Sequence, residues 1–265
     1  MAAKYSGALD LTVFPEAVVA GHSKWKQIKR KKAVADARRG AEFTRLIKEI
    51  TVAARQGGGN PDGNARLRVA IEAARAANMP ADNIERAVKK GTGELEGVHY
   101  EEVTYEGYGP GGAAILIECT TDNANRTVAD LRNIFSKNGG NLGTAGSVAW
   151  MFDKRGQIHV DATRYDEDTT LEAALEAGAA DLAREGDQYV ITTGVSDHHA
   201  VQEGLKARRI AWESAEIAMI PKSTVKVEGS DASRLMRLME ALEEHDDVSR
   251  VSSNFDVDFE ALAEV

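Results

Sequence analysis

Apolar side chains repeat at helical spacing through the first part of the chain. One set recurs at intervals of three and four residues, which places its members on one face of a helix. These residues are Phe43, Leu46, Ile47, Ile50 and Ala54. The same spacing continues over residues 67–74, and a third, short helix is expected between Pro80 and Gly91. Residues 20–93 are therefore predicted to form a helical bundle.

The pattern changes near Val98, where short apolar runs alternate with amphipathic helix patterns. Residues 113–119 form a strand pattern, residues 125–140 form a helix pattern, and a turn between two strands is expected at residues 154–156. Strands and helices that alternate at such short spacing are typical of ferredoxin-like sandwiches. The predicted fold class is α+β, with an N-terminal helical bundle followed by two ferredoxin-like α/β sandwich domains.

Charge is distributed unevenly along the chain, whose 265 residues carry a formal net charge of -9. Residues 20–90 contain 17 Lys or Arg against 7 Asp or Glu, whereas residues 91–265 contain 15 against 33. A basic segment in an acidic protein is typical of a chain that binds a polyanion. The alternative is a basic bundle that docks on the protein's own acidic domains.

The positive charge is densest in a basic arm, residues 20–32. Like charges this close repel one another, which favours a mobile arm until a polyanion neutralises it. In the helix that follows, the basic residues fall on the face opposite the apolar stripe. Trp25 is expected either to stack on an unpaired base or to anchor the arm to the bundle. The candidate nucleic-acid-binding residues are Lys24, Trp25, Lys26, Lys29, Arg30, Lys31, Lys32, Arg38, Arg39, Arg45, Lys48 and Arg55.

A second candidate site is the turn at residues 121–127, just before a predicted helix. Its polar residues can cap the helix, which explains one of them. The others are candidate contacts for a phosphate or a ribose at the helix N-terminus. The candidate phosphate contacts are Asn123, Asn125 and Arg126.

Patterns that indicate catalysis or a cofactor are largely missing from the sequence. The glycines of residues 107–112 have the spacing of a dinucleotide fingerprint, but a strand pattern follows them instead of a helix, so we interpret them as a hairpin turn. The six histidines do not assemble with other ligands at metal-binding spacing. Cys119, the single cysteine, fits a buried strand and a reducing cytoplasm. No apolar run reaches the roughly 20 residues that a membrane helix needs. We predict a cytoplasmic protein that is not an enzyme and has neither a cofactor nor a membrane partner.

Three stretches of the chain are similar to a known family. They are AGHSKWKQIKRKKAVADARRG (residues 20–40), ARLRVAIEAARAANMPADNIERAVKKGTG (residues 65–93) and GGNLGTAGSVAWMF (residues 139–152). Long ordered strings agree over about residues 20–265, so the chain resembles the YebC family, which includes the mitochondrial translational activator of cytochrome oxidase subunit one.

This resemblance implies a helical domain and two α/β domains, the second of which is interrupted by the third. We accordingly expect the basic helical domain at residues 20–93. The discontinuous α/β domain is expected at residues 94–142 with 223–265, and the inserted α/β domain at residues 143–222.

The chain departs from the family pattern at two places. Family members commonly read T-D-N-R-N-R-T, whereas Ala124 stands in the middle of the turn here, which weakens its candidate phosphate role. Family chains also begin Met-Ala-Gly-His-Ser-Lys-Trp, whereas Val19 precedes the matching residues here. Because a valine codon can start translation in bacteria, we expect residues 1–19 to be a disordered extension or to contain the true start at Val19.

The sequence favours a non-enzymatic regulator of gene expression that holds nucleic acid by its phosphates. The resemblance implies a transcriptional regulator that binds DNA, as bacterial members are customarily described. An alternative is a translation factor that acts on the ribosome through ribosomal RNA, because the acidic remainder of the chain would be repelled by an extended DNA surface. No recognition helix with side chains for base edges is evident. A second alternative is a protein-interaction module whose acidic domains bind a basic partner.

Overall fold

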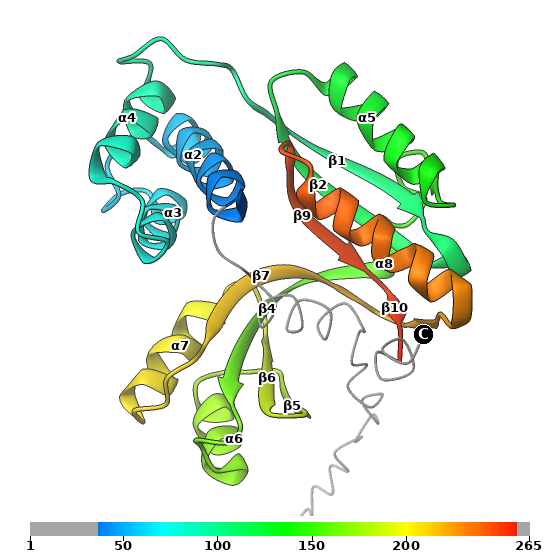
Figure 1. Ribbon diagram of the computed structural model, residues 1–265. Helices are drawn as coiled ribbons and strands as arrows, with labels where there is room; N and C mark the ends of the chain where they lie inside the picture. Colours follow the sequence, from blue (N-terminus) through cyan, green and yellow to red (C-terminus); the bar gives the residue numbers. More distant parts are fainter. Residues whose placement is uncertain (1–36, 259–265) are drawn as a thin grey trace, which may run out of the picture. The chain divides into compact units, whose positions relative to one another are not determined.

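The computed structural model describes residues 37–258, and the side chains of residues 40–258 (Figure 1). Residues 1–19, where a disordered extension or a later start is expected, and the basic arm lie outside the described residues. Residues 156–217 form one compact unit. Residues 37–155 and 218–258 together belong to the other compact unit.

The first described elements are three helices that form the predicted bundle. Their apolar stripes share one core, which includes Ile50, Leu67 and Ile84. Asn64 accepts a hydrogen bond from the amide of Leu67 and so caps the second helix, as its position before an apolar stripe predicts. The helices are α2 (Ala37–Gly57), α3 (Ala65–Ala76) and α4 (Ala81–Thr92).

A four-stranded antiparallel sheet follows, with two helices on one of its faces (Figure 1). Alternate residues of the strand β2 (Ala114–Thr121) point to opposite sides of the sheet. Ile115 and Ile117 pack with Phe135 and Leu238 from the two helices, whereas Leu116 belongs to a separate apolar cluster. The strand order is β3-β1-β2-β9. The elements are β1 (Glu101–Tyr108), β2 (Ala114–Thr121), α5 (Ala124–Lys137), β3 (Asn141–Leu142), α8 (Gly229–Glu244) and β9 (Val248–Ser253).

Short elements complete this unit. The 3-10 turns η1 (Pro110–Gly112) and η2 (Ala149–Met151) lie in its loops, and β8 (Val225–Lys226) pairs in parallel with β10 (Phe255–Asp256). Gly109, Gly111 and Gly112 lie in the connection between β1 and β2, and Gly107 lies in β1 itself. The two strands form a hairpin, as predicted. A β-hairpin here leaves no helix N-terminus for a pyrophosphate.

The second sheet has the strand order β5-β6-β4-β7. With two helices in the chain order strand, helix, strand, strand, helix, strand, this is the ferredoxin-like arrangement that the sequence predicts. Its core includes Ile158, Ile191, Val201 and Leu205. The elements are β4 (Phe152–Asp161), α6 (Glu167–Glu176), β5 (Asp181–Glu185), β6 (Gln188–Thr193), α7 (His198–Ala207) and β7 (Ser214–Pro221).

The turn expected at residues 154–156 is wrong, because these residues lie inside the long strand β4. Gly156 pairs with Thr193 of β6. A side chain at Gly156 would collide with the Thr193 hydroxyl and the His198 ring. The glycine therefore allows these two groups to approach the backbone of β4 closely, and it does not form a turn.

Among the described residues, none of the helices combines the length and the apolar character that crossing a membrane requires.

Glu185, at the end of β5, is a half-buried carboxylate. Its Oε2 atom is buried and has no hydrogen-bond partner among the described residues. Burial raises the pKa of Glu185 from its ordinary value of 4.5 to about 7. Because the folded chain holds the proton more tightly than the unfolded chain, the free energy of unfolding falls as the pH rises from about 4.5 through about 7.

We therefore expect Glu185→Gln to raise the thermal unfolding temperature at pH 8 and to leave it nearly unchanged at pH 4. A gain of about 1 kcal/mol corresponds to about 4–8 °C in a small domain. Differential scanning calorimetry at the two pH values measures the effect, with Glu172→Gln on the exposed face of α6 as the matched control. An equal shift at both pH values would show that ionisation of Glu185 is not the cause.

Candidate nucleic-acid interface

Most of the candidate nucleic-acid-binding residues precede the described side chains. Arg38 and Arg39 lie in the first turn of α2, and their side chains are not described. The candidates outside the described residues are Lys24, Trp25, Lys26, Lys29, Arg30, Lys31 and Lys32. Their role as phosphate contacts stays a prediction.

Lys48 is described, and its side chain does not face solvent. It is 7% exposed, and its Nζ donates hydrogen bonds to Asp247 Oδ1 at 2.8 Å and to the carbonyl oxygens of Asp246 at 2.9 Å and Thr120 at 3.2 Å. The prediction that Lys48 lies on the outward face of its helix is wrong. A helical wheel locates the face opposite the apolar stripe but does not show that another part of the fold covers it.

Arg45 and Arg55 are half-buried, and each guanidinium donates to a backbone carbonyl. Arg45 donates to the carbonyl oxygen of Glu243, and Arg55 donates to that of Val98 at 3.4 Å. Among the ion pairs of the described residues, no carboxylate pairs with either arginine. Their hydrogen bonds link α2 to the backbone at Glu243 and at Val98.

Asp247 is the centre of a buried polar cluster. Its side chain is 5% exposed and accepts hydrogen bonds from Lys48, from Arg126 at 2.7 Å, from Thr127 at 2.8 Å and from Thr121 at 3.2 Å. Burial alone would raise the pKa of Asp247, but the hydrogen bonds from Lys48, Arg126 and Thr127 outweigh it and hold that pKa well below its usual range. The cluster is therefore ionic at neutral pH.

The candidate phosphate contacts of the turn do lie together at the start of α5. Asn123 is the cap of that helix, because its Oδ1 accepts the amide of Arg126. The Arg126 guanidinium pairs with Asp122 at 2.8 Å and with Asp247 at 2.7 Å, and Asn125 is exposed. Two carboxylates already neutralise the only base of the turn.

An open cleft of about 530 Å³ borders this turn. Lys48 and Arg126 contribute to its lining, but both are already paired with carboxylates. The acidic residues that line it are Asp122, Asp130, Glu244, Asp246 and Asp247. Since acidic side chains outnumber basic ones, the cleft repels a phosphate. We do not retain the turn in the candidate interface.

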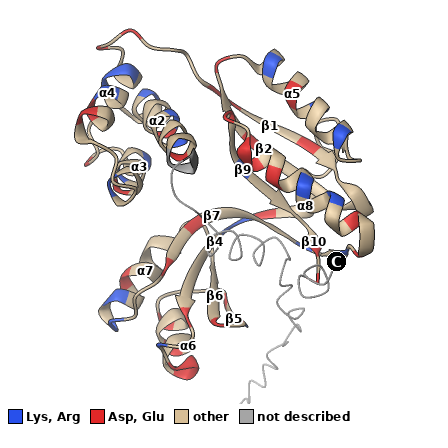
Figure 2. Ribbon diagram, in the orientation of Figure 1, with Lys and Arg blue, Asp and Glu red and all other residues tan. Residues whose placement is uncertain are grey.

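Exposed bases that the sequence predictions did not single out lie on the other helices of the bundle. Arg68 and Arg75 on α3 and Arg86 on α4 are exposed, and Figure 2 shows Lys and Arg on all three helices. Arg66 is different, because it pairs with Glu49 at 2.7 Å and with Glu102 at 2.6 Å. The sequence pattern could have indicated Arg68 and Arg75, because residues at positions i and i+7 lie on one helical face and this face is away from the apolar stripe.

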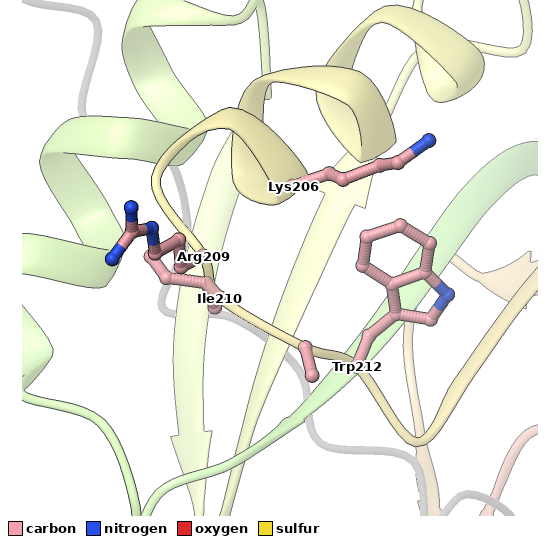
Figure 3. A pocket seen from close by; sticks show the side chains of 5 residues that line it. Lys206, Arg209, Ile210 and Trp212 are labelled. Atoms are coloured by element: carbon pink, nitrogen blue, oxygen red, sulfur yellow. The ribbon is translucent and has the colours of Figure 1, made fainter.

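A separate hollow of about 300 Å³ lies at the end of α7, in the unit of residues 156–217. In Figure 3 the Lys206 side chain extends alongside the Trp212 indole, whereas the Arg209 guanidinium points away from the indole. Ile210, Ala211 and Trp212 form the apolar part of the lining, and Lys206 and Arg209 are its two cations. We assign it no part in the candidate interface.

Metal binding and thiol chemistry depend on the His, Cys, Asp and Glu side chains of the described residues. Among them, no cluster of three or more His, Cys, Asp or Glu side chains could hold a metal ion. Cys119 is buried in β2, and burial raises the pKa of its thiol to about 12, so the reactive thiolate is scarce at neutral pH. Cys119 is a core residue.

Comparison with known proteins gives a consistent result over most of the chain. A family model described as "TACO1/YebC protein N-terminal domain" matches residues 23–94, and one described as "TACO1/YebC second and third domain" matches residues 100–255. A "Probable transcriptional regulatory protein" of Gemmatimonas aurantiaca is 57% identical over 246 residues, which are 93% of this chain and 100% of the relative.

A protein of the same description from Acidithiobacillus ferrooxidans is 58% identical over 245 residues, which are 92% of this chain and 98% of the relative. The crystal structure of a conserved hypothetical protein from Aquifex aeolicus is similar with a TM-score of 0.81 and 48% identity. That match covers 89% of this chain and 97% of the other.

Proposed function

Because the chain belongs to the TACO1/YebC family, we propose that it is a non-enzymatic regulator of gene expression that binds nucleic acid through its basic N-terminal region. The observation that carries this proposal is the segregation of charge. Residues 20–90 hold 17 Lys or Arg against 7 Asp or Glu in a chain whose net charge is -9. The names of the relatives, which describe transcriptional regulators, agree with this proposal at the level of the family.

The proposed binding to nucleic acid is electrostatic. Each base that contacts a phosphate of duplex nucleic acid releases roughly one counterion, and this release drives binding without regard to base sequence. Because Lys48 is buried in an ion pair, we assign the phosphate contacts to the basic arm and to the exposed Lys and Arg residues of the bundle. The proposed contacts in the bundle are Arg68, Arg75 and Arg86, together with Arg38 and Arg39 at the start of α2.

The relatives' names favour DNA as the target, and the charge of the remaining chain favours RNA in the ribosome. Residues 91–265 carry 33 Asp or Glu against 15 Lys or Arg. An extended duplex would repel such a surface, whereas basic ribosomal proteins beside ribosomal RNA would tolerate it. A translation factor on the ribosome is therefore the second candidate function.

Crosslinking in living cells, followed by sequencing of the attached nucleic acid, tests the proposal. The matched control is a chain in which the six Lys and Arg residues of the basic arm are replaced by Gln. Enrichment of promoter DNA over this control supports a transcriptional regulator, and enrichment of ribosomal RNA supports the translation factor. If the wild-type chain and the control recover the same background, the nucleic-acid proposal is wrong and the protein-interaction module is favoured.

A further inference from the structure

Two exposed aromatic side chains lie in a part of the chain that the proposed function does not use. Trp150 of η2 is 67% exposed, and Tyr108 at the end of β1 is 38% exposed. Trp150 belongs to residues 139–152, one of the stretches that are similar to the YebC family. A tryptophan carries a large apolar surface, so an exposed and fixed indole is a candidate for contact with a partner.

Both rings are anchored on one carbonyl oxygen. The Tyr108 hydroxyl donates to the carbonyl oxygen of Ser147 at 2.9 Å, and the Trp150 Nε1–H donates to the same oxygen at 3.1 Å. The shared acceptor brings the polar edges of the two rings together and fixes their orientation. Because both donors are already bonded within the chain, the pair offers a partner its ring faces and no free N–H or O–H.

The loop that carries Trp150 is fixed by a buried carboxylate of β1. Glu106 is 7% exposed, and its carboxylate accepts the backbone N–H groups of Gly146 at 2.6 Å, Val148 at 2.6 Å and Ala149 at 2.8 Å. Val148 and Phe152 are buried on either side of Trp150. The rings are therefore held in place before any partner arrives, which lowers the entropy cost of binding.

Positive charge lies beside the backbone of Trp150. The Lys222 ammonium donates to the carbonyl oxygen of Trp150 at 2.9 Å. It also lies 3.3 Å from Asp153, which in turn lies 3.6 Å from Arg155. Lys222 and Arg155 are both exposed, so two cations share one carboxylate here and leave a local positive charge within the acidic part of the chain.

We propose that Trp150 and Tyr108 form an aromatic platform that stacks on unpaired bases of single-stranded nucleic acid, with Lys222 and Arg155 placed to meet the neighbouring phosphates. The inference rests on the proposed function and deepens it by naming an unpaired strand as part of the partner. Stacking uses the face of a ring, which every base also offers. An aromatic anchor at a protein interface commonly directs its N–H or O–H at the partner, but Ser147 already accepts both donors here.

Binding of the full chain to a fluorescent oligouridine of about 12 nucleotides tests the platform, with a duplex of equal length as the comparison. Trp150→Ala is expected to weaken binding of oligouridine by about 10-fold and binding of the duplex by less than about 2-fold. Trp150→Phe keeps a ring and is expected to recover most of the loss. Leu175→Ala on α6, where Leu175 is 49% exposed, is the matched control and should change neither affinity.

A second variant separates stacking from charge. Lys222→Gln is expected to lower the salt dependence of oligouridine binding by about one phosphate contact, whereas Trp150→Ala should leave that salt dependence unchanged. Circular dichroism and the urea midpoint of each variant establish that it is folded. Since Trp150 is exposed, its replacement should leave both unchanged.

The outcomes distinguish this inference from the proposed function. If the wild-type chain binds the duplex and oligouridine and Trp150→Ala binds oligouridine equally well, the platform is wrong and the proposed function stands. If Trp150→Ala instead loses a protein partner while oligouridine binding is unchanged, the pair is a protein contact and the platform is also wrong. If the wild-type chain binds neither nucleic acid, both proposals fail.

Discussion

Reversal of the basic arm to acidic residues is expected to lower the affinity of the full chain for nucleic acid by about 10³-fold or more at 50 mM salt. The physical reason is the number of phosphate contacts that the arm can make. A protein with about six to ten such contacts loses about 10³–10⁵ in affinity when salt rises from 50 to 200 mM, and reversed charges add repulsion to the lost attraction. The substitutions are Lys24, Lys26, Lys29, Arg30, Lys31 and Lys32 to Glu.

A matched control separates the position of the charge from the net charge. Its substitutions to Glu are at exposed bases from the rest of the chain, namely Lys137, Lys206, Arg208, Arg209, Lys226 and Arg237. Both variants change the net charge equally, so a specific role of the arm requires a much larger loss in the arm variant. Filter binding at 50 mM salt measures both. Equal losses of affinity in the two variants would show that only net charge matters. An arm variant with the affinity of the wild-type chain would contradict the proposed phosphate contacts.

Removal of the Asp247 carboxylate is expected to destabilise the chain by about 3–5 kcal/mol. The Lys48 ammonium would then be buried without its counter-charge, and Thr127 and Arg126 would lose an acceptor. Asp247→Asn should therefore cost nearly as much as Asp247→Ala, although it preserves the volume. Lys48→Met should cost less, because Asp247 would keep its bonds to Arg126 and Thr127.

Urea unfolding at pH 7 measures these differences. The double variant Lys48→Met/Asp247→Asn should lose less stability than the sum of the two single variants, since each single variant leaves the other partner unpaired. Asp122→Asn is the matched control, because Asp122 also pairs with Arg126 but is exposed, and it should cost less than about 0.5 kcal/mol. Strict additivity in the double variant would contradict the coupling of Lys48 with Asp247.

The ion pair of Lys48 and Asp247 also predicts that the free energy of unfolding depends on pH. The folded chain holds the pKa of Asp247 below its ordinary value of 3.8, so the stabilisation by Asp247 is fully present above that value and is lost as the pH falls below it. The difference in unfolding free energy between the wild-type chain and Asp247→Asn should therefore be constant from pH 7 to about pH 5 and narrow in stronger acid. A difference that persists unchanged in strong acid would show that the carboxylate charge is not its source.

Local sequence patterns are sufficient to predict the helices of the bundle and the ferredoxin-like type of the sheet that β4, β5, β6 and β7 form. The spacing of Phe43, Leu46 and Ile50 is set by the helix itself, so the stripe that faces the core can be found without knowledge of the rest of the fold. Strands and helices that alternate at short intervals indicate the ferredoxin-like type, and the structure gives the strand order β5-β6-β4-β7.

Contacts between distant residues explain what the sequence patterns did not show. Lys48 belongs to an outward stripe on a helical wheel, but its ion pair with Asp247 spans 199 residues. Arg126 is a plausible phosphate contact in the turn, yet one of its two partners lies 121 residues away. Trp150 lies within an apolar run, which favours a buried strand, whereas Glu106 organises the loop from more than 40 residues earlier and leaves the indole exposed.

The central claim is that the cationic N-terminal region binds phosphates, and the salt dependence of binding tests it most directly. The affinity of the full chain for a duplex is measured from 50 to 300 mM salt, beside the arm variant. The account predicts that the logarithm of the binding constant falls linearly with the logarithm of the salt concentration, with a slope of about -5 or steeper. It predicts that the arm variant loses most of that slope. A slope near zero for the wild-type chain, or an equal slope for both chains, would contradict the account.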